Sequence, residues 1–233
     1  MLATFVDAQK TPYTFEAAME ALKWAMNDPA IPVLALGAAK CALETARWET
    51  IWNHNWGNVK AAADYEGMFT CIVLNERLLN KTTGKMEYVW FAPEGRLTAS
   101  PKLGGKLVGK PLPVPPGHAQ TRMRAFANRF DGADQYVRFV AEKYPTSWRA
   151  LLTGDPYAYV HALKAGGYFT AEEGPYATGV ASLQREFTRR LNGFAPDPKV
   201  EDSLDWDALR ALVAHSQFDL TRPDLDDEDP PVV

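Results

Sequence analysis

The chain has 233 residues and a globular composition, with 46% hydrophobic, 12% aromatic and 23% charged residues and a formal net charge of −4. No stretch approaches the roughly 18 consecutive apolar residues of a membrane-spanning helix, so we expect no membrane insertion. The N-terminus lacks the basic and apolar segments of a Sec signal peptide, so action outside the cytoplasm would require another route of release.

Charge is distributed unevenly along the chain. Residues 77–129 hold ten lysines and arginines against two acidic residues, whereas residues 197–233 hold eleven acidic residues against three basic ones. A basic middle suits an anionic polymer, either nucleic acid or an acidic cell wall, and is also compatible with an ordinary solvated loop. The acidic tail is expected to be disordered.

Two helices are predicted near the N-terminus. Residues 14–26 repeat apolar residues at three- and four-residue steps, which predicts an amphipathic helix. Residues 32–48 begin with Pro32, which suits a first helical position, and stay apolar almost all round until Glu44. A helix of this kind is usually central and buried.

Glu44 is the candidate catalytic residue of this segment. Burial at the end of an apolar helix would disfavour its charged form and raise its pKa, as a general acid requires near neutral pH. The alternative is an exposed Glu44 that pairs with Lys40 or Arg47 at helical spacing. The residues of this segment leave both interpretations open.

A turn rich in asparagine and tryptophan follows the helix. Its amides could bind sugar hydroxyls or N-acetyl groups, and its indole rings could cover a sugar ring. We therefore take Trp52, Asn55, Trp56 and Asn58 as candidate substrate-binding residues. The alternative is that the tryptophans belong to the core and the asparagines form the turn.

The middle of the chain is predicted to form a β lobe. Residues 68–74 and 86–91 are rich in β-branched and aromatic residues, and the turn-forming residues 80–85 lie between them, so a β-hairpin is expected. Residues 93–120 are rich in glycine and proline and are predicted to form a long irregular arm.

Helical patterns return in the second half of the chain. Three helices are predicted, over residues 132–144 with Asp131 as N-cap, over 155–169 with Asp155 as N-cap and Gly166-Gly167 at its end, and over 174–191. A short helix over 205–216 precedes the acidic tail. This order predicts an α+β fold, predominantly helical, with a β-hairpin lobe and arm at about 66–124. We expect one domain over 1–192 and an acidic extension over 193–233.

Four motifs occur in a distinctive order. They are ALET at 42–45, the asparagine-rich turn with GNVK at 57–60, the β-hairpin, and DPYAYVHALKAGGYFTAEEGPYATGVASLQREF at 155–187. This order resembles the glucosaminidase domains of glycoside hydrolase family 73, which are peptidoglycan hydrolases of bacteria and phages with a lysozyme-like α-lobe. The resemblance covers roughly residues 14–191.

The resemblance implies roles for individual residues. The family's catalytic acid falls on Glu44, and its tyrosine near the cleft falls on Tyr176. The family's hairpin carboxylate falls best on Glu76, with Glu66 and Glu87 as fallbacks. Tyr168, in the same segment as Tyr176, is a further candidate substrate-binding residue.

The chain departs from the family pattern directly after the candidate acid. The family usually continues with Ser/Thr-Gly-Trp-Gly, whereas here Thr45 is followed by Ala46, Arg47 and Trp48, so both glycines are missing. Without a glycine to end it, the helix is expected to continue for about another half turn.

The function implied is cleavage of the β-1,4 bond of the peptidoglycan glycan strand, of the endo-β-N-acetylglucosaminidase type, with Glu44 as general acid. A lytic transglycosylase or muramidase acting on the same substrate is one alternative. A non-catalytic structural or wall-binding module of a phage or secretion particle is another. Nucleic acid is not an expected partner, because the chain carries no recognised binding motif.

The remaining expectations concern partners, cofactors and location. The expected partners are peptidoglycan glycan strands and, through the acidic extension, a carrier or particle protein. No cofactor or metal site is predicted, and Cys41 and Cys71 are expected to be buried free thiols, with a bridge between them as the lesser alternative. The protein is expected to be made in the cytoplasm and to reach the cell wall after lysis, virion delivery or dedicated secretion.

Overall fold

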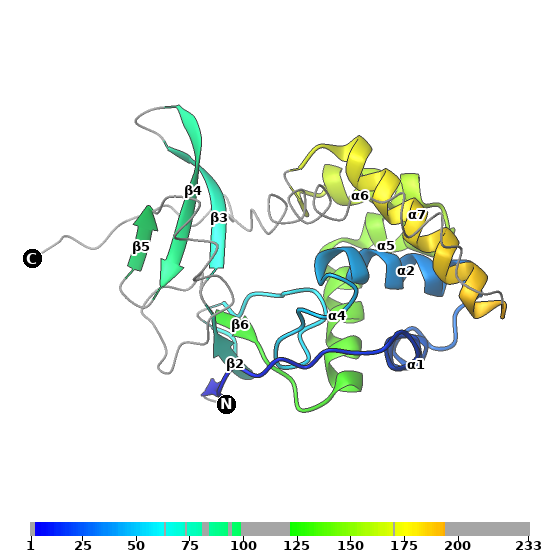
Figure 1. The fold of residues 1–233 in the computed structure, drawn as a ribbon, viewed down its shortest axis with the longest axis horizontal. Helices are drawn as coiled ribbons and strands as arrows, with labels where there is room; N and C mark the ends of the chain where they lie inside the picture. Colours follow the sequence, from blue (N-terminus) through cyan, green and yellow to red (C-terminus); the bar gives the residue numbers. More distant parts are fainter. Residues whose placement is uncertain are drawn as a thin grey trace, which may run out of the picture.

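The computed structural model describes residues 3–62, 64–72, 74–80, 84–92, 95–98, 122–169 and 171–193, with the backbone alone for the strands at 74–80, 85–92 and 95–98. Helices make up most of this described chain, and the strands gather on one side of them (Figure 1). The predicted fold class, α+β and predominantly helical with a β lobe, is therefore confirmed.

The helices form one group around a central member. The described helices are α1 (Phe15–Ala25), α2 (Ile31–Glu44), α4 (Arg129–Lys143), α5 (Pro145–Leu152), α6 (Pro156–Ala165) and α7 (Glu173–Leu191). Helix α2 packs against α1, α5 and α7 and lies between them in Figure 1. Every residue from Val33 to Glu44 is buried. The sequence prediction of a central, buried helix is thus confirmed, although the helix ends at Glu44 rather than at residue 48.

The strands form two small sheets. In one sheet the order is β1-β2-β6, where β1 (Thr4–Phe5) runs parallel to β2 (Met68–Cys71) and β6 (Arg122–Arg124) runs antiparallel to β2. In the other the order is β3-β4-β5, and β3 (Leu74–Asn80), β4 (Lys85–Ala92) and β5 (Gly95–Thr98) are antiparallel neighbours.

The predicted hairpin exists with different strand boundaries. Its strands are β3 and β4, with Leu74 opposite Phe91 and Asn80 opposite Lys85, so the prediction that residues 68–74 pair with 86–91 was wrong. Residues 68–71 join the other sheet because Phe69 and Cys71 pack into a buried cluster with Ala61. Their antiparallel partner, β6, lies some fifty residues further along the chain, and local pattern gives no sign of it.

The helix that follows β6 begins earlier than predicted. Asn128, not Asp131, is the N-cap of α4, because its Oδ1 accepts hydrogen bonds from the backbone N–H groups of Phe130 and Asp131. Asp131 instead accepts a hydrogen bond from Asn128 Nδ2 at 2.8 Å. Helix α5, which starts at Pro145, was not predicted, since its eight residues carry too little periodicity to separate it from α4.

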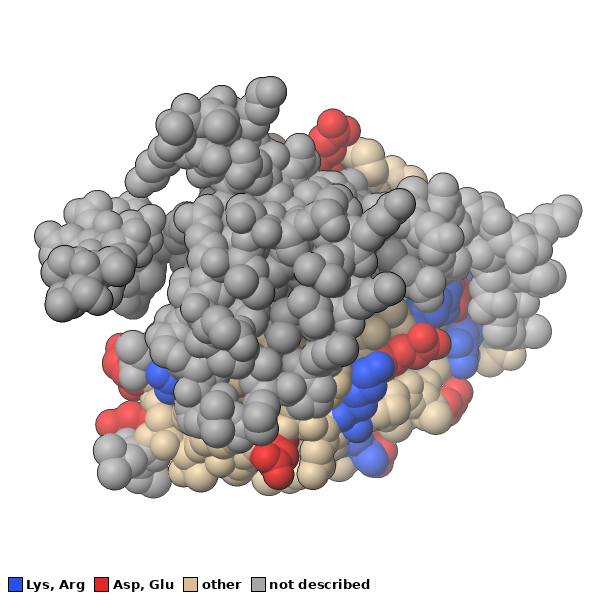
Figure 2. Space-filling model, turned by 60° about the vertical axis from the view of Figure 1, so that its left-hand side comes forward, with Lys and Arg blue, Asp and Glu red and all other residues tan. Residues whose placement is uncertain are grey.

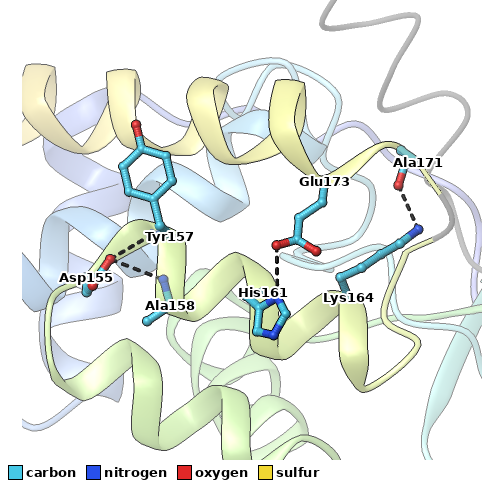
Figure 3. Close-up of polar contacts among 7 residues, drawn as sticks. All are labelled: Asp155, Tyr157, Ala158, His161, Lys164, Ala171 and Glu173. Atoms are coloured by element: carbon cyan, nitrogen blue, oxygen red, sulfur yellow. Dashed lines mark hydrogen bonds and ion pairs between the residues drawn. The ribbon is translucent and has the colours of Figure 1, made fainter.

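Polar contacts hold the start of α6 and the chain that follows its end (Figure 3). Asp155 caps α6 as predicted, accepting from the N–H groups of Tyr157 and Ala158. Gly167, with φ +73°, ends the helix, and Lys164 Nζ donates to the carbonyl of Ala171 at 2.7 Å.

A second contact in Figure 3 joins the two helices directly. His161 Nδ1 lies 3.0 Å from Glu173 Oε1 in the first turn of α7, which confirms the predicted helix at 174–191 with its start one residue earlier.

Several sequence expectations concern residues outside the described ranges. Most of the arm at 93–120, the short helix at 205–216 and the acidic tail lie there, although residues 95–98 form strand β5. On the face in Figure 2, the basic side chains of the described part lie among acidic ones, with no large patch of one sign. None of the described helices is long and apolar enough to cross a membrane. Cys41 and Cys71 are buried thiols, and neither forms a disulfide, as predicted.

Candidate active site

Glu44 is the last residue of α2 and has only 3% of its surface exposed. The apolar helix ahead of it is enclosed by neighbouring helices, so the carboxyl group lies away from solvent. Burial raises the pKa of Glu44, and the positive charge of Lys40 opposes this rise in part. The surface interpretation, in which Glu44 pairs with Lys40 or Arg47 in solvent, does not fit this position.

Tyr176 meets Glu44 from the opposite helix. Its hydroxyl, on α7, donates a hydrogen bond of 2.5 Å to Glu44 Oε1. The Tyr176 ring stacks on Phe169, with centroids 4.2 Å apart and planes at 12°. Burial raises the pKa of Tyr176 well above its usual value, so its hydroxyl stays a donor throughout the physiological range. Two residues that are 132 positions apart in the sequence therefore form one rigid unit.

Lys40 and Tyr168 form a second pair beside the first. Lys40 is fully buried on α2, one turn before Glu44, and its Nζ donates a hydrogen bond to the Tyr168 hydroxyl. Sequence reasoning considered Lys40 only as a surface partner, because a lysine is rarely buried completely. Tyr168, predicted to bind substrate, is also buried, and in this structure its hydroxyl faces Lys40.

The chain turns sharply after Glu44. Thr45 is the C-cap of α2, and Ala46, Arg47 and Trp48 have φ values of +48°, +55° and +66°. The N–H of Arg47 bonds to the carbonyl of Ala42 at 2.8 Å, which is the Schellman pattern of a helix end. The prediction that the helix continues was therefore wrong, although no glycine is present at the left-handed position.

Tertiary contacts hold this turn where glycine is missing. Arg47 makes a two-pronged ion pair with the buried Glu186 of α7, at 2.8 and 2.7 Å. Trp48 is buried, with its ring stacked on Phe187 at a centroid distance of 5.4 Å. Both contacts clamp the turn to α7, the helix that also carries Tyr176.

The asparagine turn serves mainly to shape the backbone. Asn55 is buried, and its amide bonds to both backbone groups of Val59 and to the carbonyl of Arg124. Asn58 reaches the carbonyl of Glu44 through Nδ2 at 3.5 Å, a long contact. The structure thus brings Asn58 next to Glu44, while the Asn55 side chain is occupied in tying the turn to β6.

The two candidate tryptophans lie in the packed interior. Trp56 is fully buried, stacked on Tyr13 and bonded through Nε1 to the carbonyl of Arg129. Trp52 is buried in a small cluster with Ile72 and Met123. Both rings are buried, which favours the alternative that these tryptophans belong to the core.

Among the described side chains, no carboxylate is one of the groups that shift the pKa of Glu44. The backbone of Glu76 lies in β3 opposite Val89, and the side chains of Glu76 and Glu87 belong to the strands described by backbone alone. Glu66 is described and exposed. In the described ranges, no group of three or more His, Cys, Asp and Glu side chains is placed to hold a metal ion.

An open groove lies on the β1-β2-β6 sheet rather than at Glu44. Its volume is about 420 Å³, and its lining residues come from the N-terminal segment, the asparagine turn, β2 and the chain after β6: Phe5, Val6, Asp7, Gln9, Asn53, Met68, Ala125, Phe126 and Ala127. None of the residues that line this groove belongs to the Glu44–Tyr176 pair.

Comparisons with known proteins identify no family. No protein-family model and no curated protein matches the chain. In fold it is similar to a solved structure described as a peptidoglycan hydrolase mutant from Sphingomonas sp. A1, with a TM-score of 0.43 and 19% identity over 76% of this chain and 96% of that one. A likeness at this level carries no argument about function, and the resemblance to glycoside hydrolase family 73 stays a prediction.

Proposed function

We propose that the chain is a peptidoglycan hydrolase that cleaves the β-1,4 bond of the glycan strand, of the endo-β-N-acetylglucosaminidase type. The observation that carries the proposal is the bond between Glu44 and Tyr176. The family resemblance assigned these residues from two separate motifs, one as the acid and one as the cleft tyrosine. The hydrogen bond of 2.5 Å between the Tyr176 hydroxyl and Glu44 Oε1 supports both assignments, because two residues chosen independently from distant motifs would rarely be in contact.

The proposed chemistry begins with a protonated Glu44. Burial keeps its proton to higher pH than usual, which suits a general acid. Tyr176 holds Oε1, and within the described residues no hydrogen bond is made to Oε2, which is the oxygen left to face a substrate. Glu44 transfers its proton to the glycosidic oxygen as the C1–O bond breaks, and water then adds to C1 and returns a proton.

Two groups are candidates, from the sequence, for stabilising the positive charge at C1. Glu76 is one candidate, and the N-acetyl group of the substrate itself is the other. If Glu76 acts, its distance from Glu44 would decide between retention and inversion, since retaining pairs lie about 5 Å apart and inverting pairs about 6.5–9.5 Å. The stereochemistry of the product, measured by NMR during hydrolysis, distinguishes the two outcomes.

A non-catalytic module is the second candidate, and one observation favours it. Glu44 is nearly sealed from solvent, and the neighbouring lysine favours its charged form. Such a closed polar network would also suit a wall-binding or structural part of a phage or secretion particle that kept the fold. A carrier that docks on residues 193–233 belongs to the same proposal.

Hydrolysis of purified sacculi tests the proposal. The wild-type protein is expected to release reducing sugars, and Glu44→Gln to lose at least ~100-fold in rate, because general-acid catalysis contributes on that order. Glu142→Gln is the matched control, since it makes the same change at an exposed position of α4. Equal rates for wild type and Glu44→Gln would contradict the proposal.

Mass spectrometry of the released fragments separates the activities within the enzyme class. A glucosaminidase leaves N-acetylglucosamine at the new reducing end, and a muramidase leaves N-acetylmuramic acid. A lytic transglycosylase leaves an anhydro-sugar, which is lighter by one water. We expect the first of these products, and binding to sacculi without any fragment would favour the non-catalytic module.

A further inference from the structure

Lys40 carries a buried amino group that the proposed chemistry does not use. It is fully buried on α2. Its Nζ lies 3.9 Å from the ring centroid of Tyr168 and 5.0 Å from that of Tyr136, and it donates to the Tyr168 hydroxyl. A buried ammonium is costly to retain unless it has partners, and aromatic faces with one hydroxyl supply them here.

Lys40 and Glu44 share one face of α2. Four residues on a helix bring two side chains to the same side, one above the other. Two tyrosines meet that face, because the Tyr168 hydroxyl accepts a hydrogen bond from Lys40 and the Tyr176 hydroxyl donates one to Glu44. Because both side chains are buried, the two charges act on each other more strongly than a pair at the surface would.

The other titratable groups around this face are neutral near pH 7. They are Cys41 of α2, Tyr136 of α4, Tyr159 of α6, Tyr168, and Tyr176 of α7, and burial raises the pKa of each. Arg47 lies just beyond Glu44 but is engaged with Glu186 of α7. Burial lowers the pKa of Lys40 itself, and the negative charge of Glu44 opposes that lowering. Among the described residues, Lys40 is therefore the group whose positive charge acts on Glu44, and each of the two favours the ionised form of the other.

We propose that Lys40 is a positioning residue that controls the proton on Glu44, and through it the pH range in which the site can act as an acid. Lys40 does not reach the substrate, and it acts by favouring the ionised form of Glu44. Its charge sets an upper pH limit to activity, above which Glu44 has lost the proton it must deliver. The role of Lys40 in activity rests on the proposed function, but its effect on the protonation of Glu44 can be measured without any activity.

The test is a titration of Glu44 that requires no activity. The side-chain carboxyl carbon of Glu44 is followed by ¹³C NMR in protein labelled at glutamate, and its signal is assigned by its loss in Glu44→Gln. Lys40→Met keeps the length and removes the charge, and it should move the Glu44 midpoint upward by ~1 unit or more, as removal of a close opposite charge does. The control Lys23→Met removes an exposed lysine from α1 and should leave the midpoint unchanged.

Activity on sacculi gives the second readout. The alkaline limb of the pH–rate profile should move upward in Lys40→Met by the same amount as the NMR midpoint, which a merely structural role would not produce. Tyr168→Phe, which removes the hydroxyl partner and keeps the ring, should shift the midpoint in the same direction by less. It also provides the test if Lys40→Met fails to fold.

The outcomes separate this inference from the proposed function. A Glu44 midpoint that is unchanged in Lys40→Met, or in Tyr168→Phe where the first variant is unfolded, overturns the inference. A shifted midpoint in a protein that releases no sugar from sacculi supports the control of Glu44 by Lys40 and contradicts the proposed function alone. Shifts in both readouts support both.

Discussion

At the scale of single residues, Glu44 combines burial with a firm hydrogen bond, and only part of this was predictable. The apolar stretch of α2 predicts that its last residue lies in the interior, and the structure places it there. The contact with Tyr176 required the family resemblance, because local pattern carries no information about a residue 132 positions away. The burial of Lys40 was missed, since lysine almost always reaches solvent.

Removal of the Tyr176 hydroxyl should weaken activity and change its pH dependence. The hydroxyl donates to Glu44 and favours its charged form, so Tyr176→Phe should raise the pKa of Glu44 and move the alkaline limb of the pH–rate profile upward. The loss of one orienting hydrogen bond should lower the rate about tenfold. Tyr159→Phe removes the same atom from a buried tyrosine that does not bond Glu44, and its profile should match wild type.

Glu44 should also reduce the stability of the folded protein above acidic pH. Burial raises the pKa of Glu44 on folding, so between the unfolded and folded pKa values the folded chain holds the extra proton. Stability therefore falls as pH rises through this window, by about 1.4 kcal/mol for each unit of the shift. Glu44→Gln removes the effect, so its melting temperature should exceed that of wild type at pH 7 and approach it near pH 4. A difference in melting temperature between Glu44→Gln and wild type that does not change with pH would contradict this account.

At the scale of elements, the end of α2 shows how tertiary contacts replace a missing glycine. Ala46 occupies the left-handed position of a Schellman motif, where glycine is usual because a Cβ there is strained. The sequence predicted a longer helix on this ground. Arg47 and Trp48 were not recognised as anchors, because their partners Glu186 and Phe187 lie on α7, far along the chain.

Ala46→Gly should stabilise the protein, against the usual effect of this change. At φ +48° the substitution relieves a strain of about 1 kcal/mol. Ala162→Gly, the same change within α6, should destabilise by a similar amount. Chemical denaturation of both variants measures the two free energies of unfolding. Destabilisation by both to the same degree would show that Ala46 is not strained.

The Arg47–Glu186 pair should be worth more than an exposed ion pair. Arg47→Met leaves the buried Glu186 without a partner and should cost about 3–5 kcal/mol, part of which the additional change Glu186→Gln should recover. Arg138→Met removes the exposed pair with Asp134 and should cost less than about 1 kcal/mol. Equal costs for the two arginines would contradict the role given to the clamp.

At the scale of the whole molecule, the fold class could be predicted from local sequence patterns. Helical periodicity and the capping residues predicted most of the helices, and the change to β-branched residues predicted a β lobe. The pairing of β2 with β1 and β6 could not be predicted from the sequence, because the partners of these short strands lie in distant parts of the chain. The same limit explains why the candidate site was found only in outline.

The most direct test of the account is fragment analysis by mass spectrometry after digestion of purified sacculi with wild type and with Glu44→Gln at equal concentration. The account predicts glycan fragments with a new N-acetylglucosamine reducing end from wild type, and almost none from the variant, while both proteins keep the same fold by circular dichroism. The same fragments at the same rate from both proteins would contradict it.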